Sequence, residues 1–210
     1  MHRIISLKEY GITVTTILRN ASSAELYENG IIEHNGMITS TGAFATDSGE
    51  KKGRSPKDKR LVKEPSTQDD IWWGDVNVPI SEDSFGKNRK RAIDYLNSCD
   101  KLYVMDGYAG WDPRSRIKVR IICTRPYHAL FMHNMLIRPT VEELLDFGKP
   151  DYVVFNAGQT EADSKVEGVD SKTSVGLNLA TGEFVILGTQ YAGEMKKGIF
   201  TVMHLSLIHI

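Results

Sequence analysis

The first segment of interest is GEKKGRSPKDKR, a glycine-containing stretch that is rich in basic side chains. Besides Arg60 at its end, its cations are Lys51, Lys52, Arg54, Lys57 and Lys59. Arg54 lies between Gly53 and the Ser55-Pro56 pair, a context that restricts the backbone more than a random basic run does. A guanidinium group presents two parallel N–H donors that match a carboxylate or a phosphate. The segment therefore predicts either an anion-binding loop or an ordinary solvent-exposed basic turn.

The second segment, GTQYAGEMKKG, contains Tyr191, Lys196 and Lys197 between three glycines. Two adjacent lysines disfavour each other's charged form, and partial burial of either one would act in the same direction. A neutral amine can ligate a metal or accept a proton. A basic first turn of an exposed helix is the alternative interpretation.

Other candidate sites have weaker support. His128 and His133 are not spaced as in an HExxH zinc pair, and Cys99 and Cys123 lack CxxC spacing, which favours two reduced thiols. Trp72-Trp73 is predicted to anchor an edge strand rather than to stack on a base. The nucleotide-binding patterns GxxxxGK[ST] and GxGxxG do not occur in the sequence.

Composition indicates a single globular domain. The chain has 210 residues, of which 40% are hydrophobic and 25% are charged, and its formal net charge is −1. Such a balance provides no overall field to attract nucleic acid or an anionic membrane. No signal-peptide pattern or membrane-length apolar run is visible, so we expect a soluble, cytoplasmic protein. Its oligomeric state is not predictable.

Helical and extended patterns alternate along the chain, which predicts a mixed α/β fold with a mixed sheet flanked by helices. Capping-box patterns at Ser22/Glu25 and Thr140/Glu143 mark two helix starts, and Thr181-Gly182 marks a hairpin turn. The expected helices span 24–34, 81–98, 127–135 and 141–147. The expected strands span 37–46, 60–63, 101–108, 116–123 and 151–158, followed by a hairpin over 174–189. Both basic segments therefore adjoin strands.

Several ordered strings together resemble one family. GRSPKDKR, WWG, DYLN, FMHNMLIRPT, FGKPDYVVFNAGQ and ILGTQYAGEMKKGIFTVMH look like the N-terminal half of an ATP-dependent phosphoenolpyruvate carboxykinase. The match extends from about Ala21 to His204. It implies conversion of oxaloacetate and ATP to phosphoenolpyruvate, carbon dioxide and ADP, a reaction of gluconeogenesis. It also favours the anion-site interpretation of both basic segments.

The resemblance implies roles for three residues. Arg54 would bind the carboxylate of oxaloacetate or phosphoenolpyruvate, and Tyr191 would hold carbon dioxide or the substrate carboxylate through its hydroxyl. Lys197 would ligate a transition metal, usually manganese, while magnesium accompanies ATP. Lys196 would assist electrostatically or structurally and has no ligand role.

The nucleotide-binding half of the family pattern is missing from these 210 residues. A histidine metal ligand, a phosphate-binding loop, a metal-binding aspartate and a second substrate arginine would all lie there. We therefore expect this chain alone to bind substrate without completing turnover. The alternative is a non-catalytic protein, either a truncated paralogue that binds a dicarboxylate or a subunit that joins a partner chain.

The family pattern breaks at Leu205, which divides the chain into an N-terminal carboxykinase domain over 1–204 and a tail over 205–210. The tail, LSLIHI, has three interpretations: a divergent terminus, a gene-model error or foreign sequence. A transposon-end adapter used in sequencing libraries translates to LSLIHI. The expectation is therefore that 205–210 is non-native.

Overall fold

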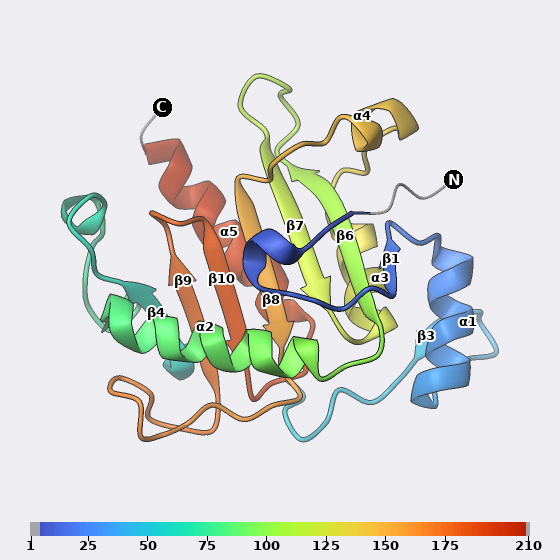
Figure 1. Cartoon of the computed structure of the whole chain (residues 1–210), viewed down its shortest axis with the longest axis horizontal. Coiled ribbons are helices and arrows are strands. Elements are labelled where there is room, and N and C mark those ends of the chain that lie inside the picture. The colour runs from blue at the N-terminus through green and yellow to red at the C-terminus, as the bar shows by residue number, and fades with distance from the viewer. Residues whose placement is uncertain (1–4, 209–210) are drawn as a thin grey trace.

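A mixed eight-stranded sheet forms the centre of the molecule in the computed structural model, which describes residues 5–208 (Figure 1). The strand order is β1-β6-β7-β8-β10-β9-β4-β5. The pairs β6/β7 and β9/β10 are antiparallel, whereas β8 runs parallel to both β7 and β10. The predicted mixed sheet flanked by helices is therefore confirmed.

The strands of the main sheet are β1 (Ile17–Arg19), β4 (Lys59–Val62), β5 (Pro79–Ile80), β6 (Leu102–Ala109), β7 (Ile117–Cys123), β8 (Tyr152–Ala157), β9 (Ser174–Asn178) and β10 (Glu183–Leu187). The helices are α1 (Ser23–His34), α2 (Glu82–Asn97), α3 (Pro126–Met135), α4 (Val141–Leu145) and α5 (Gly193–Ile208). Short 3-10 turns lie at Lys8–Tyr10, Pro56–Asp58 and Gln68–Asp70.

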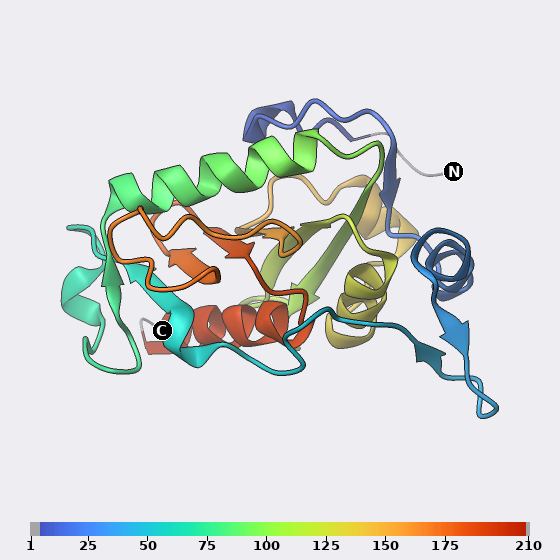
Figure 2. The ribbon, with the colours of Figure 1, turned by 90° about the horizontal axis from the view of Figure 1, so that it is seen from below.

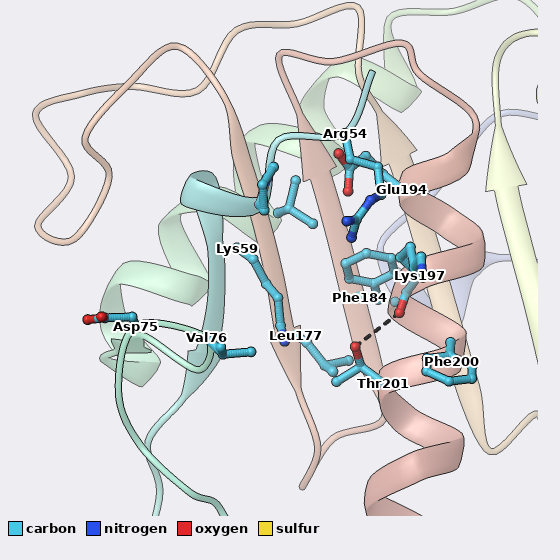
Figure 3. A pocket seen from close by; sticks show the side chains of 13 residues that line it. Arg54, Lys59, Asp75, Val76, Leu177, Phe184, Glu194, Lys197, Phe200 and Thr201 are labelled. Atoms are coloured by element: carbon cyan, nitrogen blue, oxygen red, sulfur yellow. Dashed lines mark hydrogen bonds between the residues drawn. The ribbon is translucent and has the colours of Figure 1, made fainter. Parts of the chain in front are cut away.

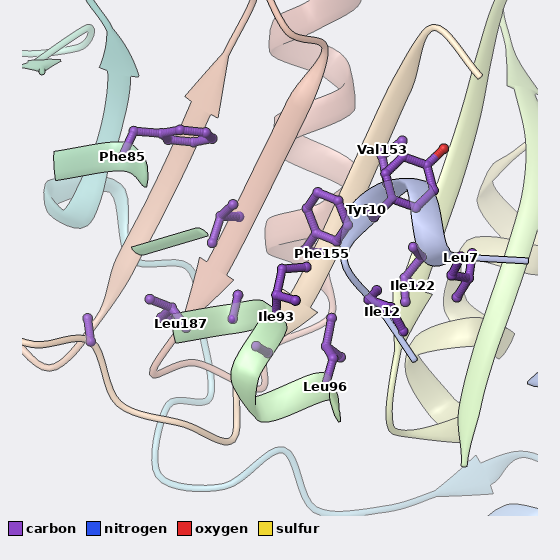
Figure 4. Close-up of a cluster of buried hydrophobic side chains, with 14 of the residues drawn as sticks. Leu7, Tyr10, Ile12, Phe85, Ile93, Leu96, Ile122, Val153, Phe155 and Leu187 are labelled. Atoms are coloured by element: carbon purple, nitrogen blue, oxygen red, sulfur yellow. The ribbon is translucent and has the colours of Figure 1, made fainter. Parts of the chain in front are cut away.

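Helices cover both faces of the sheet, which gives a three-layer arrangement (Figure 2). On one face, α2 and the N-terminal segment bury a core that includes Leu96, Tyr10 and Phe155 (Figure 4). On the other face, α3 and α5 bury a second core that includes Met132, Ile186 and Met195. Because both faces of the central strands are covered, β6 is buried along its whole length.

Local capping signals explain where the helices begin. The Ser22 hydroxyl accepts a hydrogen bond from the Glu25 amide, and the Glu25 carboxylate accepts one from the Ser22 amide at 2.8 Å. The same reciprocal pair forms at Thr140 and Glu143. Both predicted capping boxes are confirmed, since each satisfies amides that the first helical turn leaves without partners.

Two predictions about the first half of the chain were wrong. Residues 37–46 do not form one strand; β2 (Met37–Ile38) and β3 (Phe44–Ala45) pair as a small separate hairpin. Trp72 anchors no strand, since its side chain is 91% exposed. Trp73 instead donates its indole N–H to the Gln68 carbonyl at 2.8 Å. The chain enters the edge strand β5 only at Pro79.

The end of the chain continues helix α5 as far as Ile208. Residues 209 and 210 of the expected tail lie outside the described part of the chain, and the boundary at 204/205 stays a prediction. Among the described residues, no helix is long and apolar enough to cross a bilayer.

Gly198 allows helix α5 to lie close to strand β10. A Cβ atom at this position would come within 2.1 Å of the buried Phe184 ring. We predict that Gly198→Ala lowers the free energy of unfolding by roughly 1–3 kcal/mol, because the helix or the ring must shift. Urea-induced unfolding measures the change.

The matched control is Gly86→Ala in helix α2, where an added Cβ has no neighbour within 4 Å. Alanine at an open helical position is expected to stabilise by about 0.5–1 kcal/mol. Equal effects of the two substitutions would contradict the packing explanation.

Candidate functional site

A cavity of about 340 Å³ lies beside helix α5, on the sheet face formed by β9 and β10 (Figure 3). The other side is lined by residues of the segment between β3 and β4 and of the connection between β4 and β5. Its charged lining consists of Arg54, Lys59, Asp75, Glu194 and Lys197. The apolar wall includes Phe184 and Phe200.

The structure brings Arg54 and Lys197 to this one cavity from distant parts of the chain. Arg54 is exposed and has no hydrogen-bond or ion-pair partner among residues 5–208. The Lys197 ammonium group lies 5.3 Å from the centre of the Phe200 ring, a cation–π contact. The Lys197 ammonium group likewise forms no ion pair among the described residues. Both cations are therefore available to bind an anion.

The segment GEKKGRSPKDKR, residues 49–60, is called the basic loop below. Its other cations differ from Arg54 in their contacts. The Lys59 ammonium also lines the cavity and donates to the Asn77 side-chain oxygen at 3.0 Å. Burial, followed by the nearby Arg54 charge, lowers the pKa of Lys59. Lys52 pairs with Asp47 and lies outside the cavity lining. Of the six basic residues of this segment, Arg54 and Lys59 are the two that line the cavity.

Glu194 is a site residue that the sequence analysis missed. It lies in the first turn of α5, is 5% exposed and accepts a hydrogen bond from the Ser55 amide. Burial raises the pKa of Glu194, although the Ser55 amide and the charge of Arg54 act in the opposite direction. The only sequence signal was its position two residues before the lysine pair, which carries no information about burial.

Tyr191 lies on the turn before α5 and is not part of the cavity lining. Its amide donates to the Thr189 hydroxyl at 3.3 Å. The preceding carbonyl, that of Gln190, accepts hydrogen bonds from the Tyr127 hydroxyl at 2.5 Å and from His128 Nε2 at 2.7 Å. Helix α3 therefore fixes the backbone of the Tyr191 turn.

Lys196 is exposed in the first turn of α5 and is also absent from the cavity lining. The backbone of Lys196 and Lys197 is helical, as expected from the interpretation of this segment as the basic start of a helix. Of the two adjacent lysines, only Lys197 lies at the cavity.

The described residues do not form a complete metal site. No group of three or more His, Cys, Asp or Glu side chains comes together within the described part of the chain. Lys197 offers one nitrogen donor, whereas a transition metal normally takes at least four ligands. The donor set therefore does not fit a resident metal ion held by these residues alone.

Residues 15–209 match the sequence profile of the family described as phosphoenolpyruvate carboxykinase. The chain belongs to the phosphoenolpyruvate carboxykinase family. It is 58% identical over 201 residues to phosphoenolpyruvate carboxykinase (ATP) 2 of Salinibacter ruber. It is 60% identical over 201 residues to phosphoenolpyruvate carboxykinase (ATP) of Dictyostelium discoideum, and 58% identical over 190 residues to that of Saccharomyces cerevisiae.

These alignments cover most of this chain but only part of each relative. They include 95% of the chain for the first two proteins and 90% for the yeast protein. The corresponding shares of the relatives are 38%, 36% and 35%. The chain thus corresponds to an N-terminal portion of a carboxykinase.

His128 should make the carboxykinase chain sensitive to mild acid. The ring is 1% exposed, and burial lowers its pKa from 6.5 to about 4. The neutral ring is therefore favoured in the folded state, while the unfolded ring takes up a proton at a higher pH. We predict a loss of about 2 kcal/mol of unfolding free energy between about pH 7 and about pH 5 from this group.

Urea titrations at both pH values test this expectation, with His128→Gln as the comparison. The glutamine amide can still donate to the Gln190 carbonyl but cannot titrate. The pH-dependent loss should be smaller in the variant by about the predicted amount. Identical losses in both proteins would show that His128 is not responsible.

Proposed function

We propose that this chain is the substrate-binding portion of an ATP-dependent phosphoenolpyruvate carboxykinase. The reaction is conversion of oxaloacetate and ATP to phosphoenolpyruvate, carbon dioxide and ADP, in the direction of gluconeogenesis. The observation that supports it is the presence of Arg54 and Lys197, both without ion-pair partners among the described residues, in one cavity. Family membership supports the same reaction.

The residue types suit this chemistry. Oxaloacetate carries two carboxylates, and Arg54 can bind one of them through two parallel N–H groups. Loss of carbon dioxide leaves an enolate, whose developing negative charge is stabilised by cations already in position. Lys197 would contribute as a neutral amine that helps to hold a manganese ion, whose charge lies at this cavity, and Lys59 adds a positive charge to the same lining.

Tyr191 is proposed to hold carbon dioxide or the substrate carboxylate through its hydroxyl. Its position on the turn beside α5 supports this role only indirectly, because the ring is not part of the cavity lining. The role rests on the GTQYAGEMKKG string.

Phosphoryl transfer requires groups that cradle the phosphates of ATP. We propose that in a carboxykinase of the relatives' length, residues beyond this portion hold ATP with magnesium and complete the manganese site to which Lys197 belongs. The 210 residues alone are then expected to bind the dicarboxylate without forming phosphoenolpyruvate.

Arg54 provides the direct test of the substrate site. Arg54→Ala is expected to weaken oxaloacetate binding roughly 10- to 100-fold, the effect of losing hydrogen bonds to a charged group. Isothermal titration calorimetry measures the affinity. Lys52→Ala is the matched control, because this cation lies on the same loop and pairs with Asp47 outside the cavity. Equal affinities of the two variants would contradict the proposed site.

The metal role of Lys197 has a separate readout. Oxaloacetate chelates divalent cations through its oxygens and can supply ligands that the described residues lack. We expect manganese to tighten oxaloacetate binding to the wild-type chain and to Lys52→Ala, and to have no such effect on Lys197→Ala. Retention of the manganese effect in Lys197→Ala would exclude the lysine as a ligand.

A further inference from the structure

Glu194 is a buried carboxylate where the basic loop meets helix α5, and the proposed chemistry gives it no role. Its oxygen accepts a hydrogen bond from the amide of Ser55, the residue directly after Arg54. The Glu194 carboxylate also lines the cavity, at the same end as the Arg54 side chain (Figure 3). One side chain of α5 therefore contacts the backbone that carries the substrate-binding arginine.

The other polar contacts of this loop do not reach α5. The Lys51 ammonium bonds the Ser55 hydroxyl at 3.1 Å and the Asp58 carboxylate at 3.2 Å, which closes the loop on itself. Asp58 accepts a hydrogen bond from the Ser171 hydroxyl at 2.7 Å, which connects the loop to the segment before β9. Between this loop and α5, the Ser55–Glu194 hydrogen bond is the one polar contact that the described residues make.

A favourable interaction with the helix dipole does not explain the burial of this carboxylate. An acidic residue in a first turn gains from the dipole while it remains in water. Glu194 is instead removed from water, which is costly for a charged group unless hydrogen bonds compensate. The compensating bond leads away from the helix to a segment far along the chain, which is the arrangement expected of a structural tie.

We propose that Glu194 is a positioning residue that holds Arg54 at the wall of the cavity by binding the Ser55 amide. This role rests on the proposed function in so far as Arg54 binds oxaloacetate. This role requires a side chain of the length of glutamate with an oxygen that accepts the hydrogen bond from the Ser55 amide. It does not require the negative charge. The charge in fact opposes an entering anion, because it lies beside Arg54.

Two substitutions separate the acceptor from the charge. Glu194→Gln keeps a side-chain oxygen that can accept from the Ser55 amide, whereas Glu194→Ala removes it. Glu82→Ala is the matched control. Glu82 lies in the exposed first turn of α2, which has 16 residues as α5 does. Thermal unfolding of all variants shows whether each remains folded.

The first readout is amide hydrogen exchange at Ser55, measured by NMR, which does not depend on any ligand. Glu194→Ala should exchange this amide roughly tenfold faster or more, because local opening no longer breaks a hydrogen bond. Glu194→Gln and Glu82→Ala should exchange as the wild type does. Unchanged exchange at Ser55 in Glu194→Ala would overturn the proposal.

The second readout is oxaloacetate affinity by calorimetry. Glu194→Ala should bind roughly tenfold more weakly, and Glu194→Gln should bind at least as tightly as wild type. In an Arg54→Ala background, Glu194→Ala should cause no further loss, since the two residues act through the same contact. Faster exchange with unchanged affinity, or an equal loss in the Gln variant, would overturn the positioning role.

The two readouts also separate this inference from the proposed function. A wild-type chain that does not bind oxaloacetate would contradict the substrate site. Exchange at Ser55 would still decide whether Glu194 holds the loop.

Discussion

Helix α5 lies so close to strand β10 that position 198 has no room for a side chain, and the cavity depends on this contact. With the helix fixed at this depth, residues three, four and seven positions apart face the same side. Glu194, Lys197 and Thr201 accordingly line one wall. The Thr201 hydroxyl donates to the Lys197 carbonyl at 3.0 Å, one turn earlier in the helix. A helix displaced outward would separate these groups from Arg54.

The half of the sheet away from the cavity, formed by β1, β6 and β7, contains buried charges that are paired with each other. Asp106 on β6 is buried between Arg19 on β1 and Arg120 on β7, with Nε-to-carboxylate distances of 2.8 and 2.7 Å. Breaking such a pair would leave an uncompensated buried charge, so the cluster ties three strands together. In the cavity, by contrast, Arg54 and Lys197 have no described ion-pair partners. Cations that share a cavity repel each other, and this repulsion opposes folding, which favours a functional reason for their position.

Local signals made much of the fold predictable. The capping boxes at Ser22 and Thr140 and the turn at Gly182 each depend on residues a few positions apart. The order of the strands depends on pairing between distant segments, so no local pattern contains it. Glu194 was missed for the same reason, because its burial follows from contact with Ser55. Arg54 and Lys197 could be named from the sequence through the family resemblance, whereas their shared cavity is a result of the fold.

The electrostatics of the cavity favour an anionic occupant. Burial and the charge of Arg54 lower the pKa of Lys59, whereas burial raises the pKa of Glu194. Burial is the largest cause of both shifts, because it disfavours the ionised form of each group. An entering dicarboxylate stabilises the protonated form of Lys59 and further disfavours the ionised form of Glu194. An anion in the cavity would therefore raise the pKa of both groups, which opposes the effect of burial on Lys59 and adds to the effect of burial on Glu194.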